Sequence, residues 1–155
     1  MKVKDIMNSP VQSCGPETNL GAAAMMMWDS DCGVLPVVNY EGTVVGMITD
    51  RDICMAAATK NRHPSEITVF ETIAGQVYAC APGDDIHDAM KTMAKHQVRR
   101  LPVINDAGVL AGMLSLNDIV LHAGETKGGH ASAISCEDVT QTLKAIDAHR
   151  ILVGL

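Results

Sequence analysis

The chain of 155 residues has little of what nucleic-acid-binding and membrane proteins need. Its four aromatic residues, Trp28, Tyr40, Phe70 and Tyr78, are too few for a base-stacking platform. Twelve Lys and Arg stand against 18 Asp and Glu, a net charge of −6, so a basic surface for nucleic acid is absent. No apolar run approaches the roughly 18–20 residues of a membrane span. We therefore expect neither nucleic acid nor a membrane as a partner.

The sequence also lacks the spacings of disulfide frameworks and metal sites. Its five cysteines are an odd number and include no CxxC pair, which argues against both a disulfide framework and a zinc site. Its six histidines form neither an i,i+4 pair nor an HExxH motif, so no metal is predicted. Reduced thiols, and a start at residues 1–5 without an apolar signal region, indicate a cytoplasmic protein.

The sequence repeats itself at an offset of 66 residues. Between residues 35–53 and 101–119, nine of nineteen positions are identical without a gap. The matched segments include Leu-Pro-Val at 35–37 and 101–103, and Gly-Met at 46–47 and 112–113. Self-similarity at one fixed spacing indicates two copies of one structural unit.

Each copy predicts the same order of elements, β-α-β-β-α. A short extended run, 11–14 or 77–80, is followed by a proline. A helix comes next, over 18–29 or 84–96, where Ala and Met recur at helical spacing. Two apolar strands follow, 35–38 with 44–48 and 101–104 with 109–114, joined by turns that end in Gly42 and Gly108. A second helix begins after Thr49 and after Ser115.

The predicted fold class is α/β, with the two repeats in a pseudo-two-fold pair, because a lone unit of about 60 residues buries too little surface. We place the repeats at 1–62 and 63–124, with a polar linker at 60–65. Residues 125–155 are expected to form a loose segment and then a C-terminal helix that begins at Ser135, with Asp138 three residues on. The helix has an apolar stripe that must dock on the body, a second subunit or another protein: Val139, Leu143, Ile146 and Ile151.

The two strand-to-helix junctions are the candidate chemical sites. They read Thr-Asp-Arg-Asp at 49–52 and Ser-Leu-Asn-Asp at 115–118. One interpretation is a capping box, in which the hydroxyl caps the helix and the acid reaches back to the backbone. The other is a ligand site, because an aspartate there can accept hydrogen bonds from a ribose diol and the helix-start N–H groups suit a phosphate. The residues alone leave both interpretations open.

Basic side chains are unequally distributed between the two junctions. Arg51 lies inside the first, whereas Arg99 and Arg100 precede the second Leu-Pro-Val, at positions where the first copy has Gly33 and Val34. Such charges also occur on exposed strand edges. A doubled arginine in a chain with only 12 basic residues favours the second site as the better equipped for phosphate.

The paired segments at 46–53 and 112–119, each after Leu-Pro-Val, resemble a tandem of CBS (cystathionine-β-synthase) domains, the Bateman module. The resemblance covers residues 1–124 and includes the leaders 3–7 and 69–73, where Ile73 replaces the more usual Met. It implies a regulatory module that senses AMP, ADP, ATP, NAD or S-adenosylmethionine in clefts between the two repeats. It further implies a homodimer that signals to a partner protein, without a catalytic cofactor.

Carried over by position, the resemblance implies fourteen ligand-binding residues. The ribose and the α-phosphate would be met by Thr49, Asp52, Ser115 and Asp118, with the two aspartates on the ribose hydroxyls. The phosphates would be met by Arg51, Arg99 and Arg100, with Asn117 in the place of Arg51. The adenine pocket would be lined by Val11, Gln12, Met47, Val77, Tyr78 and Met113.

Two other functions stay open at this point. A ligand-independent adaptor would act through the C-terminal helix. An enzyme would use Cys14 or Cys80, which lie at equivalent strand ends, but the chain has no nucleophile elbow, P-loop or GxGxxG, so no enzymatic activity is predicted. Methionines 25–27 are expected in a core or a dimer seam, and Trp28, where the second repeat has Ala94, at a dimer surface.

Overall fold

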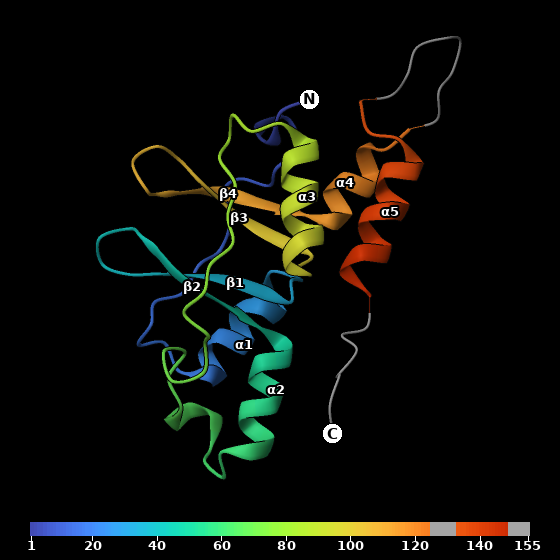
Figure 1. Ribbon diagram of the computed structural model, residues 1–155. Helices are drawn as coiled ribbons and strands as arrows, with labels where there is room; N and C mark the ends of the chain where they lie inside the picture. Colours follow the sequence, from blue (N-terminus) through green and yellow to red (C-terminus); the bar gives the residue numbers. More distant parts are fainter. Residues whose placement is uncertain (125–132, 149–155) are drawn as a thin grey trace. The chain divides into compact units, whose positions relative to one another are not determined.

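The computed structural model describes residues 1–124 and 133–148 (Figure 1). Their helices and strands are α1 (Leu20–Asp29), β1 (Val34–Val38), β2 (Val44–Thr49), α2 (Asp50–Thr59), α3 (Ile86–His96), β3 (Arg100–Ile104), β4 (Leu110–Ser115), α4 (Leu116–His122) and α5 (Cys136–Ile146). Short 3₁₀ turns lie at Val3–Asp5 and Pro64–Glu66. The mixed α/β class and the repeated order of helices and hairpins are confirmed. The first helix of each repeat begins two residues later than predicted, because Asn19 and Asp85 act as the N-caps.

Each repeat contains one two-stranded sheet, β1 with β2 and β3 with β4. In the first hairpin the strands are antiparallel, with Val34 opposite Thr49. Gly42 and Gly108 have φ angles of +82° and +78°, a conformation that costs glycine little. The two turns predicted from the sequence are therefore confirmed.

The predicted first strand of each repeat is wrong as a strand: it is a single parallel bridge. Cys14 bridges Val37 and Cys80 bridges Val103. The Cys14 amide donates to the Pro36 carbonyl at 3.0 Å and the Cys80 amide to Pro102 at 3.2 Å. Because Pro36 and Pro102 have no backbone N–H, they cannot donate the next hydrogen bond to the incoming segment, and the pairing stops there.

The chain divides into two compact units that exchange their leaders. The first-repeat unit consists of residues 10–77 and 104–110, and the second-repeat unit of 1–9, 78–103 and 111–155. Val3 and Ile6 are buried in the core of the second-repeat unit, whereas Ile67 and Val69 are buried in that of the first. Each repeat therefore completes its core with the segment that precedes the other repeat in sequence.

Two equivalent glycines make room for the exchanged leaders. A Cβ on Gly46 would clash with the end of the Ile73 side chain, and one on Gly112 would lie 2.5 Å from the Asn8 carbonyl. Ile73 and Met7 occupy equivalent leader positions, and the Met7 sulfur would lie 3.1 Å from that second Cβ. A side chain in the middle of β2 or β4 would displace the leader.

The C-terminal helix docks on the second-repeat unit, alongside α3 (Figure 1). Ser135 caps it as predicted, and Ile134 and Ile146 are buried in the core of that unit. The helix has 11 residues, with Leu143 exposed, and Ile151 lies outside the described residues. Its buried face is therefore used within the chain.

Candidate functional site

The first junction is a closed capping box. The Thr49 amide and hydroxyl donate to Asp52 Oδ2 at 2.9 and 2.8 Å, and the Asp52 amide donates to the Thr49 hydroxyl at 3.1 Å. Among the described residues, nothing donates to the second carboxylate oxygen, Oδ1, of Asp52. A carboxylate offers about four lone-pair sites, so this oxygen retains its capacity to accept.

The second junction repeats the box and adds a distant partner. The Ser115 amide and hydroxyl donate to Asp118 Oδ2 at 2.8 and 2.6 Å. The Asn8 side-chain amide donates to Asp118 Oδ1 at 2.7 Å. Asn8 is held there by two backbone bonds with Met113. Its equivalent in the other leader is Ala74, whose side chain has no donor, and Asp52 has no such partner among the described residues.

A third capping box lies outside both junctions, at the start of α5. The Ser135 amide and hydroxyl donate to Asp138 Oδ2 at 2.9 and 2.7 Å, nearly the distances found at Asp52 and Asp118. Ser135 lowers the pKa of Asp138 through both hydrogen bonds, and His87 lowers it further. The capping interpretation is confirmed for both junctions, whereas the contact with ribose stays a prediction.

The first junction carries one more acid than the second. Gly33 and Asp50 meet there, with a hydrogen bond of 3.1 Å from the Asp50 amide to the Gly33 carbonyl. A Cβ on residue 33 would lie 2.7 Å from the Asp50 carboxylate, so the uncharged Gly33 leaves room for Asp50. Arg51 is exposed, and its guanidinium has no partner in the part of the chain that the structure describes.

Of the arginines at the second junction, one is already paired. Arg99 donates to Asp147, just past the end of α5, at 2.6 Å, and both side chains are about half exposed. Gln97 donates at 2.8 Å to the Ala148 carbonyl at the same end of α5. Arg100 and Asn117 are exposed. Asp147, at the end of α5, therefore already pairs with one of the two arginines that are predicted to meet phosphate.

The predicted adenine-contacting residues divide between the two units. Val11, Gln12, Met47 and Val77 belong to the first-repeat unit, and Tyr78 and Met113 to the second. Met47 lies on β2, two residues before Thr49. Val11 and Gln12 lead into the Cys14 bridge, on the other edge of β1 from β2.

One contact of these residues was missed by the sequence reasoning. The Tyr78 ring stacks on His96, with ring centroids 3.8 Å apart and planes 17° apart. One face of Tyr78 is therefore already covered.

The two equivalent cysteines are poor nucleophiles. Burial raises the pKa of Cys14 from 9.0 to about 11 and that of Cys80 to about 12. The thiolate is the reactive form, so the hypothesis of an enzyme acting through either thiol receives no support from their surroundings.

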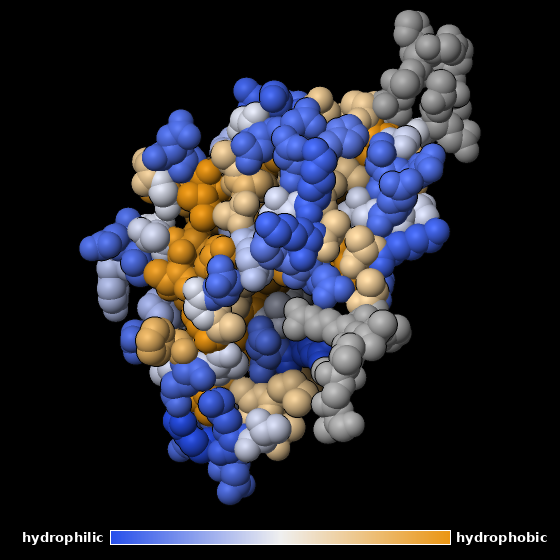
Figure 2. All heavy atoms as spheres, in the orientation of Figure 1, coloured by the Kyte–Doolittle hydropathy of each residue, from blue (hydrophilic) through white to orange (hydrophobic). Residues whose placement is uncertain are grey.

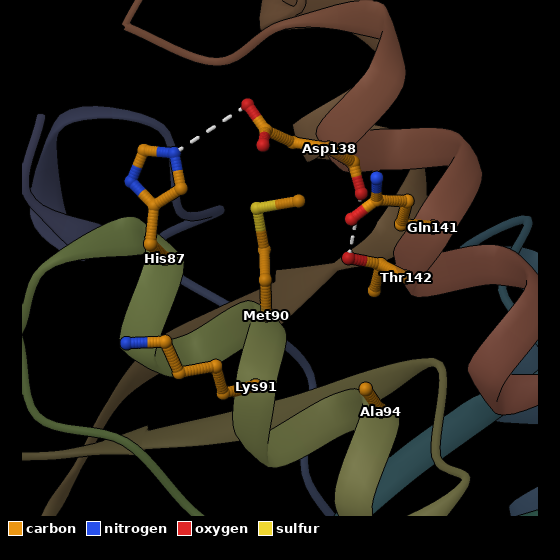
Figure 3. Close-up of a pocket in the computed structure, with 7 residues that line it drawn as sticks. All are labelled: His87, Met90, Lys91, Ala94, Asp138, Gln141 and Thr142. Atoms are coloured by element: carbon orange, nitrogen blue, oxygen red, sulfur yellow. Dashed lines mark hydrogen bonds and ion pairs between the residues drawn. The ribbon is translucent and has the colours of Figure 1, made fainter.

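A hollow of about 270 Å³ lies between α3 and α5 (Figure 3). Figure 3 shows His87 facing Asp138. The Met90 side chain extends from α3 into the space beside α5. His87 Nδ1 lies 3.1 Å from Asp85, and its Nε2 lies 3.6 Å from Asp138. None of the fourteen predicted residues lines this hollow.

The described residues offer neither a metal cluster nor a membrane-spanning helix. No group of three His, Cys, Asp or Glu side chains among them could hold a metal ion. No helix in residues 1–124 or 133–148 is long and apolar enough to cross a membrane.

Comparison with known proteins identifies the two repeats. The CBS domain model matches residues 3–59 and 71–125. The CBS domain-containing protein YhcV of Bacillus subtilis is 32% identical over 139 residues, which cover 88% of this chain and 97% of YhcV. Hypoxic response protein 1 of Mycobacterium tuberculosis is 34% identical over 122 residues, or 79% of this chain and 85% of that protein.

Solved structures agree with these matches. A structure of Hypoxic Response Protein I with two coordinated zinc ions has a TM-score of 0.73 at 33% identity, covering 80% of this chain and all of that one. A CBS domain pair in complex with 5′-methylthioadenosine and S-adenosyl-L-methionine has a TM-score of 0.71 at 25% identity, covering 78% of this chain and 94% of that one. A CBS domain protein of Thermoplasma acidophilum shares the fold, with a TM-score of 0.77 at 21% identity, over 94% and 75% of the two chains.

Proposed function

This chain belongs to the CBS domain family, and from that premise we propose that it is a regulatory module that binds adenosine-containing ligands. The first repeat takes a phosphate-free adenosine compound of the S-adenosylmethionine class. The second takes a phosphate-bearing one, AMP, ADP, ATP or NAD, after it releases internal contacts. Binding acts by stabilising the ligand-competent arrangement of the chain, which a partner protein reads as a shift in population.

The observation that carries the proposal is Oδ1 of Asp52, which accepts no hydrogen bond from the described part of the chain. Its Oδ2 closes the capping box, which fixes the carboxylate without using up its capacity to accept. Its Oδ1 is left for a ribose hydroxyl. The cap thus orients the carboxylate in advance, and a pre-oriented group loses less entropy when a ligand binds.

The charge at the first junction selects the ligand class. Asp50, Arg51 and Asp52 sum to −1, which favours a neutral or cationic compound over one that carries phosphates. S-adenosylmethionine has a sulfonium cation and 5′-methylthioadenosine is uncharged. The related CBS domain pair described above is in complex with these two compounds, which supports the same class here.

The second repeat has the opposite balance. Arg99, Arg100 and Asp118 sum to +1, which favours a phosphate. Two protein groups compete with that ligand, because Asn8 occupies the free oxygen of Asp118 and Asp147 pairs with Arg99. A phosphate-bearing ligand binds here more weakly than the intact arginine pair alone would allow.

Thermal unfolding of the full chain with separate ligands tests the proposal. A ligand at one hundred times its dissociation constant adds about 2.7 kcal/mol of apparent stability, or roughly 5–10 °C in Tm for a chain of this length. We expect S-adenosylmethionine and 5′-methylthioadenosine to reach this shift at lower concentration than AMP, ATP or NAD. Adenine-free analogues, methionine and inorganic phosphate, serve as controls.

The outcomes separate the alternatives. A response to phosphate-bearing ligands alone would overturn the assignment of the first site. No response to any adenosine compound would overturn ligand sensing and favour the adaptor function, although α5 already uses its buried face within its own unit. A cytoplasmic location belongs to the same proposal and is supported by five free thiols.

A further inference from the structure

The C-terminal end of α5 is held by the segment that joins α3 to β3. Arg99 Nη2 donates at 2.6 Å to Oδ1 of Asp147, the residue that follows α5. Gln97 ends α3 in a left-handed conformation, with φ +54°, and its side-chain amide donates to the carbonyls of Ala145 and Ala148 at 3.4 and 2.8 Å. Two residues of one short connection therefore hold the last carbonyls of α5 and the carboxylate beyond them.

The same connection is part of the second junction. The Arg99 carbonyl accepts from the amide of Leu116, the first residue of α4, at 2.9 Å, so the Arg99 backbone is fixed beside the Ser115 cap. In the first repeat the equivalent bond runs from Asp50 to Gly33, which has no side chain. The second repeat, unlike the first, therefore has a cation at this position, and the end of α5 engages it.

The buried apolar side chains that dock α5 lie at its two ends. Ile134 precedes the helix and Ile146 ends it, and both are buried in the core of the second-repeat unit. Between them, the hollow of about 270 Å³ lies against α3 (Figure 3). Figure 2 shows mainly hydrophilic side chains on the outer surface of α3 and α5. Because an isolated helix of 11 residues is marginal in water, α5 depends on the contacts at both ends.

We propose that α5 is an autoinhibitory helix of the second repeat. The Asp147 carboxylate occupies Arg99 in place of a ligand phosphate, so a phosphate-bearing ligand and a docked α5 exclude one another. This inference rests on the proposed phosphate-bearing ligand of the second repeat. Coupling between two binding events is reciprocal: the ligand undocks the C-terminal end of α5, and the docked α5 weakens ligand binding by the same factor.

The geometry of the pair favours a phosphate over the carboxylate in this exchange. The pair joins one guanidinium nitrogen of Arg99 to one carboxylate oxygen of Asp147, and both side chains are about half exposed. Such a pair contributes little stability and is screened by salt. A phosphate, by contrast, accepts two parallel hydrogen bonds from one guanidinium. The carboxylate therefore holds Arg99 at the end of α5 only until a phosphate replaces it.

Hydrogen exchange of the full chain, followed amide by amide, tests the undocking. AMP at saturation should speed exchange in α5 about fivefold or more, because the helix loses its anchor at Arg99. S-adenosylmethionine, the proposed ligand of the first repeat, is the control and should leave exchange in α5 unchanged. Titration of the same samples establishes that AMP is bound. Slower or unchanged exchange in α5 with AMP bound would overturn the autoinhibition and leave ligand binding intact.

A variant at the other end of α5 separates release of the helix from competition by one carboxylate. Ile134→Ala removes a buried contact roughly 16 Å along the helix from Asp147 and should tighten AMP binding about fivefold or more. Leu143→Ala, at an exposed position of the same helix, is the control and should bind AMP as the wild type does. Unchanged AMP affinity in Ile134→Ala would overturn the autoinhibition.

The remaining outcomes separate this inference from the proposed function. Absence of AMP binding in the wild type and in both variants would overturn the phosphate-bearing ligand, and the autoinhibition with it. The exchange experiment needs no variant, so it decides the question if Ile134→Ala does not fold.

Discussion

The two repeats share a capped helix start but differ in what reaches it from far away in the sequence. At Asp52 the carboxylate accepts, among the residues that the structure describes, only from the backbone and hydroxyl of Thr49 at the start of its own helix. At Asp118 the same carboxylate also accepts from Asn8, 110 residues away. Arg99 is paired with Asp147, whereas Arg51 has no described partner. Duplicated local sequence thus gives equal caps but unequal sites.

The third capping box explains why the local pattern is ambiguous. Ser135 and Asp138 form it in a helix outside both repeats. A hydroxyl followed three residues later by an acid is sufficient to start a helix, so the pattern by itself does not require a ligand. What separates a site from a cap is the partner of the second carboxylate oxygen.

The largest effect is expected at Asp52. Asp52→Asn should abolish the roughly 5–10 °C stabilisation by S-adenosylmethionine, because the charged acceptor for ribose is lost. Asp138→Asn is the matched control, since it alters the same type of cap and should keep the full ligand shift. Both variants should lose up to about 1 kcal/mol of stability without ligand. An unchanged ligand shift in Asp52→Asn would assign the residue to capping alone.

Next in size is the contrast between the two strand glycines. Gly112→Ala should destabilise the fold by about 1–3 kcal/mol, because its Cβ would meet the Asn8 backbone carbonyl at 2.5 Å. Gly46→Ala should cost less, since its Cβ would meet the end of the flexible Ile73 side chain. Urea unfolding of the two variants measures the difference. Equal losses would show that the leaders are not held as described.

A smaller effect is expected when the second junction is released. Asn8→Ala removes the donor to Asp118, and Asp147→Asn removes the anion on Arg99. Each should tighten AMP or ATP binding by about two- to tenfold, the equivalent of one modest hydrogen bond or ion pair. Titration of both variants with AMP measures this. Weaker binding in Asn8→Ala would mean that Asn8 contacts the ligand instead of competing with it.

The smallest effect is the loss of stability in acid at the leader that contains Glu71. Arg62, through a bond of 2.7 Å, and then Thr68 lower the pKa of Glu71 from 4.5 to about 2. The stabilisation is therefore complete above pH 4.5 and is lost as the pH falls toward 2. Glu71→Gln should show a shallower loss of stability than the wild type over this range. Identical acid unfolding curves would show that the pair contributes nothing.

The sequence predicted what depends on neighbouring residues. The hairpin turns at Gly42 and Gly108 and the helix starts after Thr49, Ser115 and Ser135 follow from local backbone preferences. It overestimated the strands at 11–14 and 77–80, because the limit comes from Pro36 and Pro102 in a neighbouring strand.

Contacts between distant segments were not predictable from local patterns. The bond from Asn8 to Asp118, the pair of Arg99 with Asp147 and the stack of Tyr78 on His96 join residues 18 or more positions apart. Both leaders were recognised as equivalent, yet nothing in their sequence indicated that each completes the core of the other repeat.

Isothermal titration of the ligand-free chain with S-adenosylmethionine shows whether Asp52 holds the ligand. We expect saturable binding of one molecule per chain, retained in Asp118→Asn and lost in Asp52→Asn. The absence of any binding heat in the wild type would contradict ligand binding at Asp52. Loss of binding in Asp118→Asn, with normal binding in Asp52→Asn, would contradict it as well.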